Sequence, residues 1–257
     1  MKRLFESIGR RQYVELACIG FIALVGLWFL LTLTGFVPKL FLPAPGDVLR
    51  QVTHGPSLRE WLIDLVYSCS RVMAGFLLAA LVGIPLGLYI GAWARFAAVS
   101  APLVEMARYV PVPALLPLCI LWVGIGEFQK ILIIFLGTFF QLIVAVAAAS
   151  RATPQEFVDV ARTLGLSEQK ILWRVVLPAA WPSIFETLQI SLGWAWSYLV
   201  VAEIVAAGSG IGYRIMWAQR YLQVGLVFVN ILELAMLGLA TDLMFRLLRK
   251  RLFKWAQ

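Results

Sequence analysis

The stretch TPQEFVDVARTLGLSEQKILWRVVLPAAWP, residues 153–182, is a long polar interruption in an otherwise apolar chain. It carries charged residues, a central glycine and two closing prolines, and hydrophobic runs of membrane-spanning length flank it on both sides. A polar segment in this setting indicates a connection between two membrane spans that has a structure of its own.

The composition of the whole chain supports a membrane protein. Of the 257 residues, 61% are hydrophobic and only 14% are charged, whereas about 25% would be charged in a soluble domain. A soluble domain of this length needs more charged residues than this, because too much of its surface faces water for so many apolar side chains to be buried. Long apolar runs without strict alternation also exclude a transmembrane barrel. We therefore predict an all-α integral membrane protein.

The hydrophobic runs predict six transmembrane helices, since each helix needs roughly 20 apolar residues to cross the hydrocarbon core. The expected spans are 13–35, 66–92, 98–124, 128–150, 182–207 and 224–248. Together they form a transmembrane domain over 13–248, which contains the polar segment 153–178 between the fourth and fifth spans. Two short basic segments, 1–12 and 249–257, flank this domain.

The lysines and arginines predict the orientation of the chain. An even number of spans puts both termini on one side, and most basic residues, including those of the polar segment, fall on that side. Fewer fall on the other side, namely Lys39, Arg50, Arg59, Lys130, Arg214 and Arg220. Because positive charge collects on the cytoplasmic side, both termini and the polar segment are predicted to be cytoplasmic. The same rule accounts for the net charge of +8, so we expect no nucleic-acid partner.

The first half of the polar segment has the pattern of an amphipathic helix. Thr153 to Glu156 matches a capping box with a proline at the first helical position. A spacing of i, i+3, i+4 and i+7 then places four apolar side chains on one helix face. This apolar stripe consists of Phe157, Val160, Ala161 and Leu164, and Asp159 points away from it.

The second half predicts a turn and a second helix. Gly165 ends the first helix, because glycine best adopts the left-handed conformation that follows a helix C-terminus. Ser167 can cap the second helix, and Pro178 ends it. The apolar side chains of this helix are Ile171, Leu172, Val175 and Val176. A helix-turn-helix with such defined caps and turn favours a surface that docks on a partner over a purely structural loop.

The motifs of common catalytic and cofactor sites are missing. The sequence has no P-loop and no dinucleotide-binding glycine pattern, so it cannot bind ATP through a P-loop of its own. Its cysteines, Cys18, Cys69 and Cys119, have no paired spacing, and its lone histidine, His54, has no neighbouring metal ligands. We therefore expect no metal, no cofactor and no enzymatic activity in this chain.

The polar segment resembles the "EAA" loop of ABC importer permeases, whose pattern is Glu-Ala-Ala-x3-Gly-x9-Ile-x-Leu-Pro. The matching positions are Asp159, Val160, Ala161, Gly165, Val175, Leu177 and Pro178. Asp159 replaces the glutamate of the pattern and Val160 replaces its first alanine, and both departures are mild.

Four further stretches look like the nitrate/sulfonate/taurine/bicarbonate branch of these permeases. They are FLPAPGDVL at 41–49, RVMAGFLLAALVGIPLGLYIG at 71–91, RYVPVPALLPLCILWVGIGEFQKI at 108–131 and WSYLVVAEIVAAGSGIGYRI at 196–215. Because all five stretches occur in order, the resemblance extends over most of the chain.

The resemblance implies the membrane subunit of an ATP-driven importer for a small anionic solute. It implies a homodimer of permeases in the bacterial cytoplasmic membrane, two cytoplasmic ATPase subunits that hold ATP and Mg, and an extracytoplasmic solute-binding protein. The hairpin would couple to the ATPase through Phe157, Asp159, Val160, Ala161, Leu164, Gly165, Leu166, Leu177 and Pro178. The alternative is a secondary transporter without an ATPase, which would normally show internal repeats; we find no convincing repeat.

Polar residues within the spans are candidates for the solute path, because such residues are costly in lipid and usually face a cavity or the bundle interior. We expect Glu105, Arg108, Gln141 and Glu203 to be among them. Glu105 and Arg108 stand at i and i+3, so they could instead form a structural ion pair. The prolines that follow Arg108 would loosen the helix beside it.

Overall fold

The computed structural model describes residues 9–54 and 56–256, and every regular element in these ranges is helical. The predicted all-α class is therefore confirmed. Lys2 and Arg3 of the expected N-terminal basic segment lie outside the described residues. The chain divides into two compact units, of which unit 1 comprises 1–55 and 217–229 and unit 2 comprises 56–216 and 230–257.

Unit 1 contains α1 (Arg10–Leu33) and the short α2 (Pro45–His54). It also holds the end of α10 (Ile211–Arg220) and the beginning of α11 (Val224–Leu252). The indole of Trp28 stacks on Phe228 with ring centroids 5.7 Å apart and donates a hydrogen bond to the carbonyl of Pro43 at 3.0 Å. These contacts anchor α1 within the unit.

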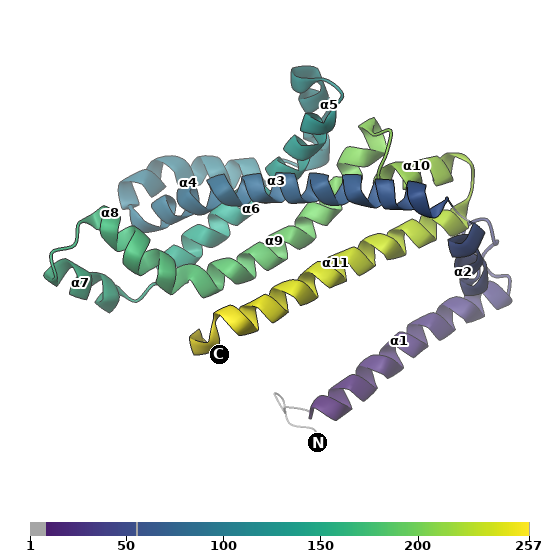
Figure 1. Cartoon of the computed structure of the whole chain (residues 1–257), viewed down its shortest axis with the longest axis horizontal. Coiled ribbons are helices and arrows are strands. Elements are labelled where there is room, and N and C mark those ends of the chain that lie inside the picture. Colours follow the sequence, from purple (N-terminus) through teal and green to yellow (C-terminus); the bar gives the residue numbers. More distant parts are fainter. Residues whose placement is uncertain (1–8, 55, 257) are drawn as a thin grey trace. The chain divides into compact units, whose positions relative to one another are not determined.

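Unit 2 is built around α3 (Leu58–Ala92), α6 (Glu127–Arg151) and α9 (Leu177–Ala206), which pack side by side (Figure 1). Glycines on α3 let the backbone of α6 approach closely. A β-carbon at Gly75 would lie 2.7 Å from Cβ of Ile134, and one at Gly87 would lie 2.7 Å from Cβ of Val146. Small residues at such crossings are typical of membrane helices, which gain stability from close packing.

The third predicted span, 98–124, is not one continuous helix. It is divided into α4 (Ala94–Arg108) and α5 (Val112–Val123), which meet at an angle of 99°. Pro111 lacks a backbone N–H and disfavours helical backbone at Val110 before it, so the helix breaks here. Pro113 lies in the first turn of α5, where proline is tolerated. The described chain thus has five helices of spanning length and composition, or six if the bent pair forms one span.

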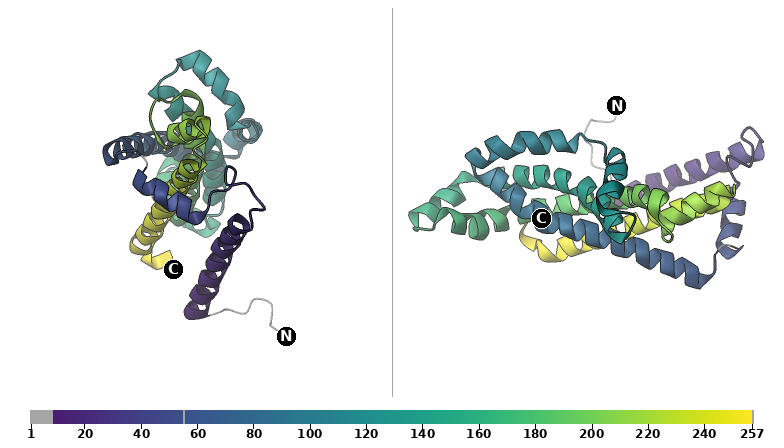
Figure 2. Two further views of the ribbon diagram at one scale, coloured as in Figure 1. Left: turned by 90° about the vertical axis from the view of Figure 1, so that its right-hand side faces the viewer. Right: turned by 90° about the horizontal axis from the view of Figure 1, so that it is seen from above.

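The polar segment forms α7 (Gln155–Thr163) and α8 (Glu168–Ile171), which lie at one end of unit 2 in Figures 1 and 2. The prediction that Pro178 ends the second helix is wrong. A π-helical turn, η1 (Leu172–Val176), joins α8 directly to α9, and Pro178 lies in the first turn of α9. Pro178 has no backbone N–H to pair, and the wider π-helical turn before it accommodates the missing hydrogen bond.

The C-terminal helix is longer than the predicted span 224–248. α11 continues to Leu252 and a short 3₁₀ turn, η2 (Lys254–Ala256), follows. Between them, Phe253 is buried and contacts Phe185 with ring centroids 5.5 Å apart. The expected boundary at 248 therefore falls inside a packed helix.

Candidate functional site

The apolar stripe of α7 is largely uncovered. Phe157, Val160 and Leu164 expose 52%, 61% and 74% of their surface, whereas Ala161 is buried at 5%. The helix is held to unit 2 through its other side chains, because Val158 packs against the main hydrophobic core. Three of the four predicted stripe residues thus form an apolar surface that the described chain leaves without a partner.

The start of α7 differs from the predicted capping box. The helix begins at Gln155, with Pro154 as its N-cap residue and no side-chain cap. The hydroxyl of Thr153 is buried and has no hydrogen-bond partner among the residues that the structure describes. The predicted cap is therefore wrong, because the helix starts one residue too late for Thr153 to reach its free N–H groups.

The turn after α7 confirms the expected role of Gly165, whose φ is +74°. The N–H of Gly165 donates to the carbonyl of Arg162 at 2.9 Å, and the N–H of Leu166 donates to the carbonyl of Ala161 at 3.1 Å. This pair of bonds is a Schellman motif, which closes a helix around a left-handed residue. Leu166 then packs into the core, so the turn has one defined direction.

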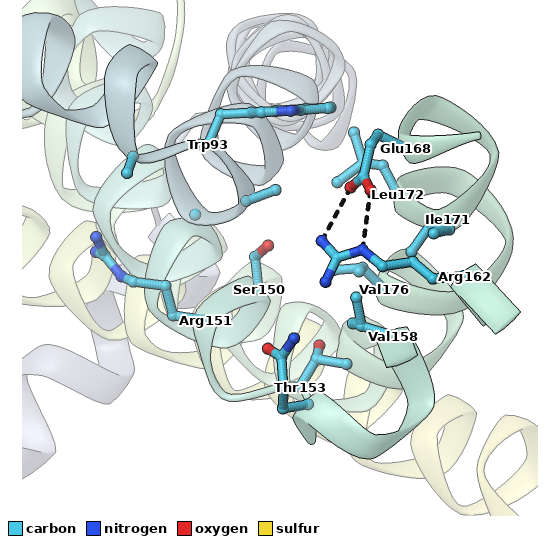
Figure 3. A pocket seen from close by; sticks show the side chains of 14 residues that line it. Trp93, Ser150, Arg151, Thr153, Val158, Arg162, Glu168, Ile171, Leu172 and Val176 are labelled. Atoms are coloured by element: carbon cyan, nitrogen blue, oxygen red, sulfur yellow. Dashed lines mark hydrogen bonds and ion pairs between the residues drawn. The ribbon is translucent and has the colours of Figure 1, made fainter. Parts of the chain in front are cut away.

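An ion-pair brace joins the two helices of the hairpin (Figure 3). Arg162 Nε donates to Glu168 Oε1 at 2.9 Å. Arg162 Nη1 also donates to Asp159 Oδ1 at 3.3 Å. The hydrogen bond from Arg162 lowers the pKa of the Glu168 carboxyl below its ordinary value, which favours the charged form of that carboxylate. Asp159, predicted to contact the ATPase, belongs to this brace.

A groove of about 520 Å³ separates the hairpin from the ends of α3 and α6. Figure 3 shows Trp93, Ser150 and Arg151 on one side of it and Arg162 and Glu168 on the other. The hairpin therefore lines a groove on the side that faces the rest of unit 2. It also exposes the apolar stripe of α7.

A second cluster of polar side chains lies inside unit 2. Arg71 on α3 exposes only 1% of its surface. Its Nη1 donates to Glu203 at 2.6 Å and to the carbonyl of Ser209 at 2.7 Å, while Nε and Nη2 donate to both oxygens of Glu127 at 2.6 and 2.7 Å. One guanidinium thus links α3, α6, α9 and the loop before α10. Bidentate bonding of this kind fixes geometry as well as charge.

Glu203 is fully enclosed by this cluster. Its carboxylate also accepts hydrogen bonds from Ser68 Oγ at 2.8 Å and from the N–H of Gly212 at 2.8 Å. A β-carbon at Gly210 would overlap the same carboxylate, and Gly210 has a φ of +115°. The backbone before α10 therefore closes over Glu203.

Further along the same helix face, α3 makes a second set of buried ion pairs. Arg214 on α10 lies 3.3 Å from Asp64 and donates to Glu233 on α11 at 2.7 Å. The indole of Trp61 donates to Glu233 at 3.1 Å. Sequence reasoning missed Glu127, Asp64 and Glu233. Their arginine partners lie on other helices, so the pairing depends on how those helices pack, and only the isolated charges in or beside the apolar runs gave any signal.

Arg108 and Gln141, both predicted path residues, line one cavity of about 280 Å³ beside the bend between α4 and α5. Arg108 Nη2 donates to the hydroxyl of Tyr109 at 3.1 Å. Within the described ranges no ion pair joins Arg108 to Glu105, which is exposed and does not line the cavity. Glu203 also lies elsewhere, so the structure brings together two of the four predicted path residues.

The fold and this arrangement define a class of protein: an all-α membrane protein with a bundle of spans and a structured hairpin between two of them. The same fold occurs in a chain of the MetNI methionine ABC transporter, solved in inward facing conformations. The TM-score is 0.68, at 18% identity, with 76% of this chain and 96% of that chain covered.

The family follows from the sequence comparisons. The family model described as binding-protein-dependent transport system inner membrane component matches residues 70–254. The chain belongs to this family of transport permeases. It is 35% identical to the taurine transport system permease TauC of Escherichia coli K12, over 92% of this chain and 88% of the relative.

Two further relatives are also named as transport permeases. The putative aliphatic sulfonates transport permease SsuC of Bacillus subtilis 168 is 36% identical, over 90% of this chain and 84% of the relative. A probable ABC transporter permease of Brucella abortus is 36% identical, with 93% and 94% covered. The predicted ABC permease branch is therefore confirmed, and these named relatives lie in its taurine and sulfonate part.

Proposed function

We propose that the chain is the membrane-spanning subunit of an ATP-driven importer for a small anionic solute of the sulfonate kind. It acts as a homodimer with two cytoplasmic ATPase subunits, which hold ATP and Mg, and it receives solute from an extracytoplasmic binding protein. Both termini lie in the cytoplasm of a bacterial cell. The names of the taurine and sulfonate relatives support the solute class, and the family description supports the binding protein.

The exposed apolar stripe on α7 carries this proposal. Phe157, Val160 and Leu164 sit on a helix whose direction is set by the Schellman turn at Gly165 and by the Arg162 brace. Leaving three large apolar side chains in water on a predicted cytoplasmic hairpin is unfavourable, and burial against a protein partner would remove that cost. An amphipathic helix laid into an apolar groove is a common mode of recognition.

The continuous helical run from α8 through η1 to α9 gives the hairpin a direct connection to the membrane bundle. Movement of a docked hairpin would be passed along α9, which carries Tyr198 at the cavity and Glu203 in the buried cluster. We assign Glu203 a structural role in holding α9 against α3, and we assign Arg108 and Gln141 to the solute path. Glu105 has no part in the site that the cavity defines.

The test is copurification of the native complex in mild detergent, with the Val160→Asp variant compared with Gln169→Asp. Both residues are exposed on the hairpin, and only Val160 belongs to the stripe. A charge placed in a desolvated interface is strongly unfavourable. We expect Val160→Asp to lose the ATPase while its membrane abundance stays unchanged, and Gln169→Asp to keep it.

A secondary transporter is the outcome that would contradict this proposal. In that case the wild-type chain would purify without an ATPase, and membrane vesicles would take up solute without ATP. Equal retention of the ATPase by both variants would instead show that the stripe is not the coupling surface.

A further inference from the structure

The cavity at the bend between α4 and α5 is lined from three directions. Arg108 ends α4, Tyr109 lies in the bend, Gln141 comes from α6 and Tyr198 comes from α9. The volume of about 280 Å³ lies just below the range of roughly 300–1,000 Å³ that holds drug-sized ligands. The space therefore suits a solute of a few heavy atoms.

Arg108 differs from the other basic side chains of the interior. Four basic residues of the described chain are not exposed, namely Arg71, Arg108, Lys130 and Arg214. Arg71, Lys130 and Arg214 each have carboxylate partners within 4 Å, whereas Arg108 forms no ion pair with any residue that the structure describes. Within the described residues its buried Nε also has no hydrogen-bond partner; Arg214 has unpaired guanidinium nitrogens too, but the carboxylates of Asp64 and Glu233 offset its charge. A guanidinium that has neither a carboxylate partner nor an acceptor for its Nε indicates a place for an anion.

The other lining residues supply further hydrogen-bonding groups and an apolar wall. The polar groups are the hydroxyls of Tyr109 and Tyr198 and the amide of Gln141, and the described lining includes no carboxylate. Tyr198 reaches this place because its ring lies directly on Gly137 of α6, where a β-carbon would overlap it. Leu136 and Phe140 add apolar surface for a short aliphatic chain.

We propose that this cavity is a binding site for a small alkyl sulfonate on its way through the membrane. The inference rests on the proposed function and adds the residues that recognise the solute. A sulfonate is a tetrahedral monoanion with three acceptor oxygens. One guanidinium edge can meet two of these oxygens, while a tyrosine hydroxyl meets the third from another element. A planar carboxylate offers only two oxygens, both of which an arginine can occupy alone.

The first experiment measures binding without transport. The wild-type permease–ATPase complex, freed of the solute-binding protein, is treated with phenylglyoxal, and arginine modification is followed by mass spectrometry with and without ethanesulfonate. We expect ethanesulfonate to slow modification of Arg108 severalfold and to leave Arg95 unaffected, since Arg95 is exposed on the same helix. Equal rates at Arg108 with and without ethanesulfonate would overturn the site. Equal protection by propionate would overturn its preference for a sulfonate.

The second experiment measures ATP-driven uptake of labelled ethanesulfonate by the whole complex. Arg108→Gln should reduce uptake roughly tenfold or more, since a lost charge-assisted hydrogen bond is worth at least that factor. Arg108→Lys should retain part of the uptake, and Arg95→Gln should match wild type. Full uptake by Arg108→Gln would overturn the site. If the wild-type complex retained its ATPase but took up no sulfonate, the sulfonate site would also be overturned, while the assignment of the chain to an ATP-driven importer would stand.

Discussion

Arg71 and Glu203 stand 132 residues apart in the sequence, and their guanidinium and carboxylate groups meet at 2.6 Å with almost no exposure to solvent. Glu127 occupies the other edge of the same guanidinium. Three helices of unit 2 are therefore held together by one side chain. Charges buried in this way are costly to separate, because each would remain in a low-dielectric interior without a partner.

Replacing Arg71 should destabilise unit 2 strongly. Arg71→Gln leaves the carboxylate of Glu203 buried without its counter-charge, which we expect to cost about 3–5 kcal/mol. Thermal unfolding of the detergent-solubilised protein measures the loss, and the double variant Arg71→Gln/Glu203→Gln should recover part of it. Arg246→Gln, which removes an exposed pair with Asp242, is the matched control and should change little. An unaltered melting temperature for Arg71→Gln would show that the buried pair does not hold the helices.

Gly165 should tolerate no side chain, even though nothing lies within 4 Å of the position a β-carbon would take. Its φ of +74° costs an L-residue roughly 1–2 kcal/mol, so Gly165→Ala should loosen the turn and Gly165→Val should disrupt it. We expect reduced ATPase copurification with normal membrane insertion. Gly193→Ala, within α9 and equally unobstructed, has no positive φ and should behave like wild type. Equal behaviour of the Gly165 and Gly193 variants would contradict this reasoning.

Ala161 and Val160 should respond differently to the same charge. Ala161 is buried against unit 2, so Ala161→Asp should unfold the hairpin and lower the amount of protein in the membrane. Val160→Asp should leave that amount unchanged, because Val160 is exposed. Quantifying membrane-inserted protein for both variants provides the comparison. If both variants inserted equally well, the inward packing of Ala161 would be unimportant for stability.

Glu105 should be dispensable for the stability of α4. Because it makes no ion pair with Arg108 in the described structure, Glu105→Gln should leave the melting temperature and the uptake unchanged. The same reasoning predicts that Glu105→Gln does not rescue Arg108→Gln in a double-mutant cycle. Recovery of uptake in the double variant would show that the two residues act as a pair.

Local patterns predicted the hairpin well. The spacing of Phe157, Val160 and Leu164 and the glycine at position 165 are short-range features, and both depend on helical periodicity and backbone conformation alone. The pairing of Arg71 with Glu127 and Glu203 could not be predicted, because it depends on how three distant helices pack. Arg108 could be recognised from the sequence as a charge in an apolar run. The cavity beside it could not be predicted, because it depends on where α6 and α9 lie.

Two errors concerned proline, whose effect depends on what surrounds it. The chain turns by 99° between α4 and α5 at Pro111, a larger change than a loosened helix, whereas Pro113 lies in the first turn of α5. Pro178 does not end a helix, because the π-helical turn before it absorbs the irregularity and α9 begins there. The prolines in the sequence indicate an irregular helix at both places, but they do not determine how far the helix axis bends at either one.

The π-helical turn at Leu172–Val176 also sets a rule for how the chain can vary in length. A π-helical turn closes i→i+5 hydrogen bonds and holds about one residue more than an α-helical turn, so deleting one residue from η1 would leave an α-helix with little rotation of α9. Within α9 each residue advances the rotation by about 100°, so a deletion there would turn the rest of the helix by about that angle relative to the hairpin. Glu203 would then face away from Arg71, and Tyr198 would leave the cavity. Insertions and deletions should therefore be tolerated in the loops around unit 2 and rejected in α9 between Leu177 and Glu203, where the number of residues matters as much as their identity.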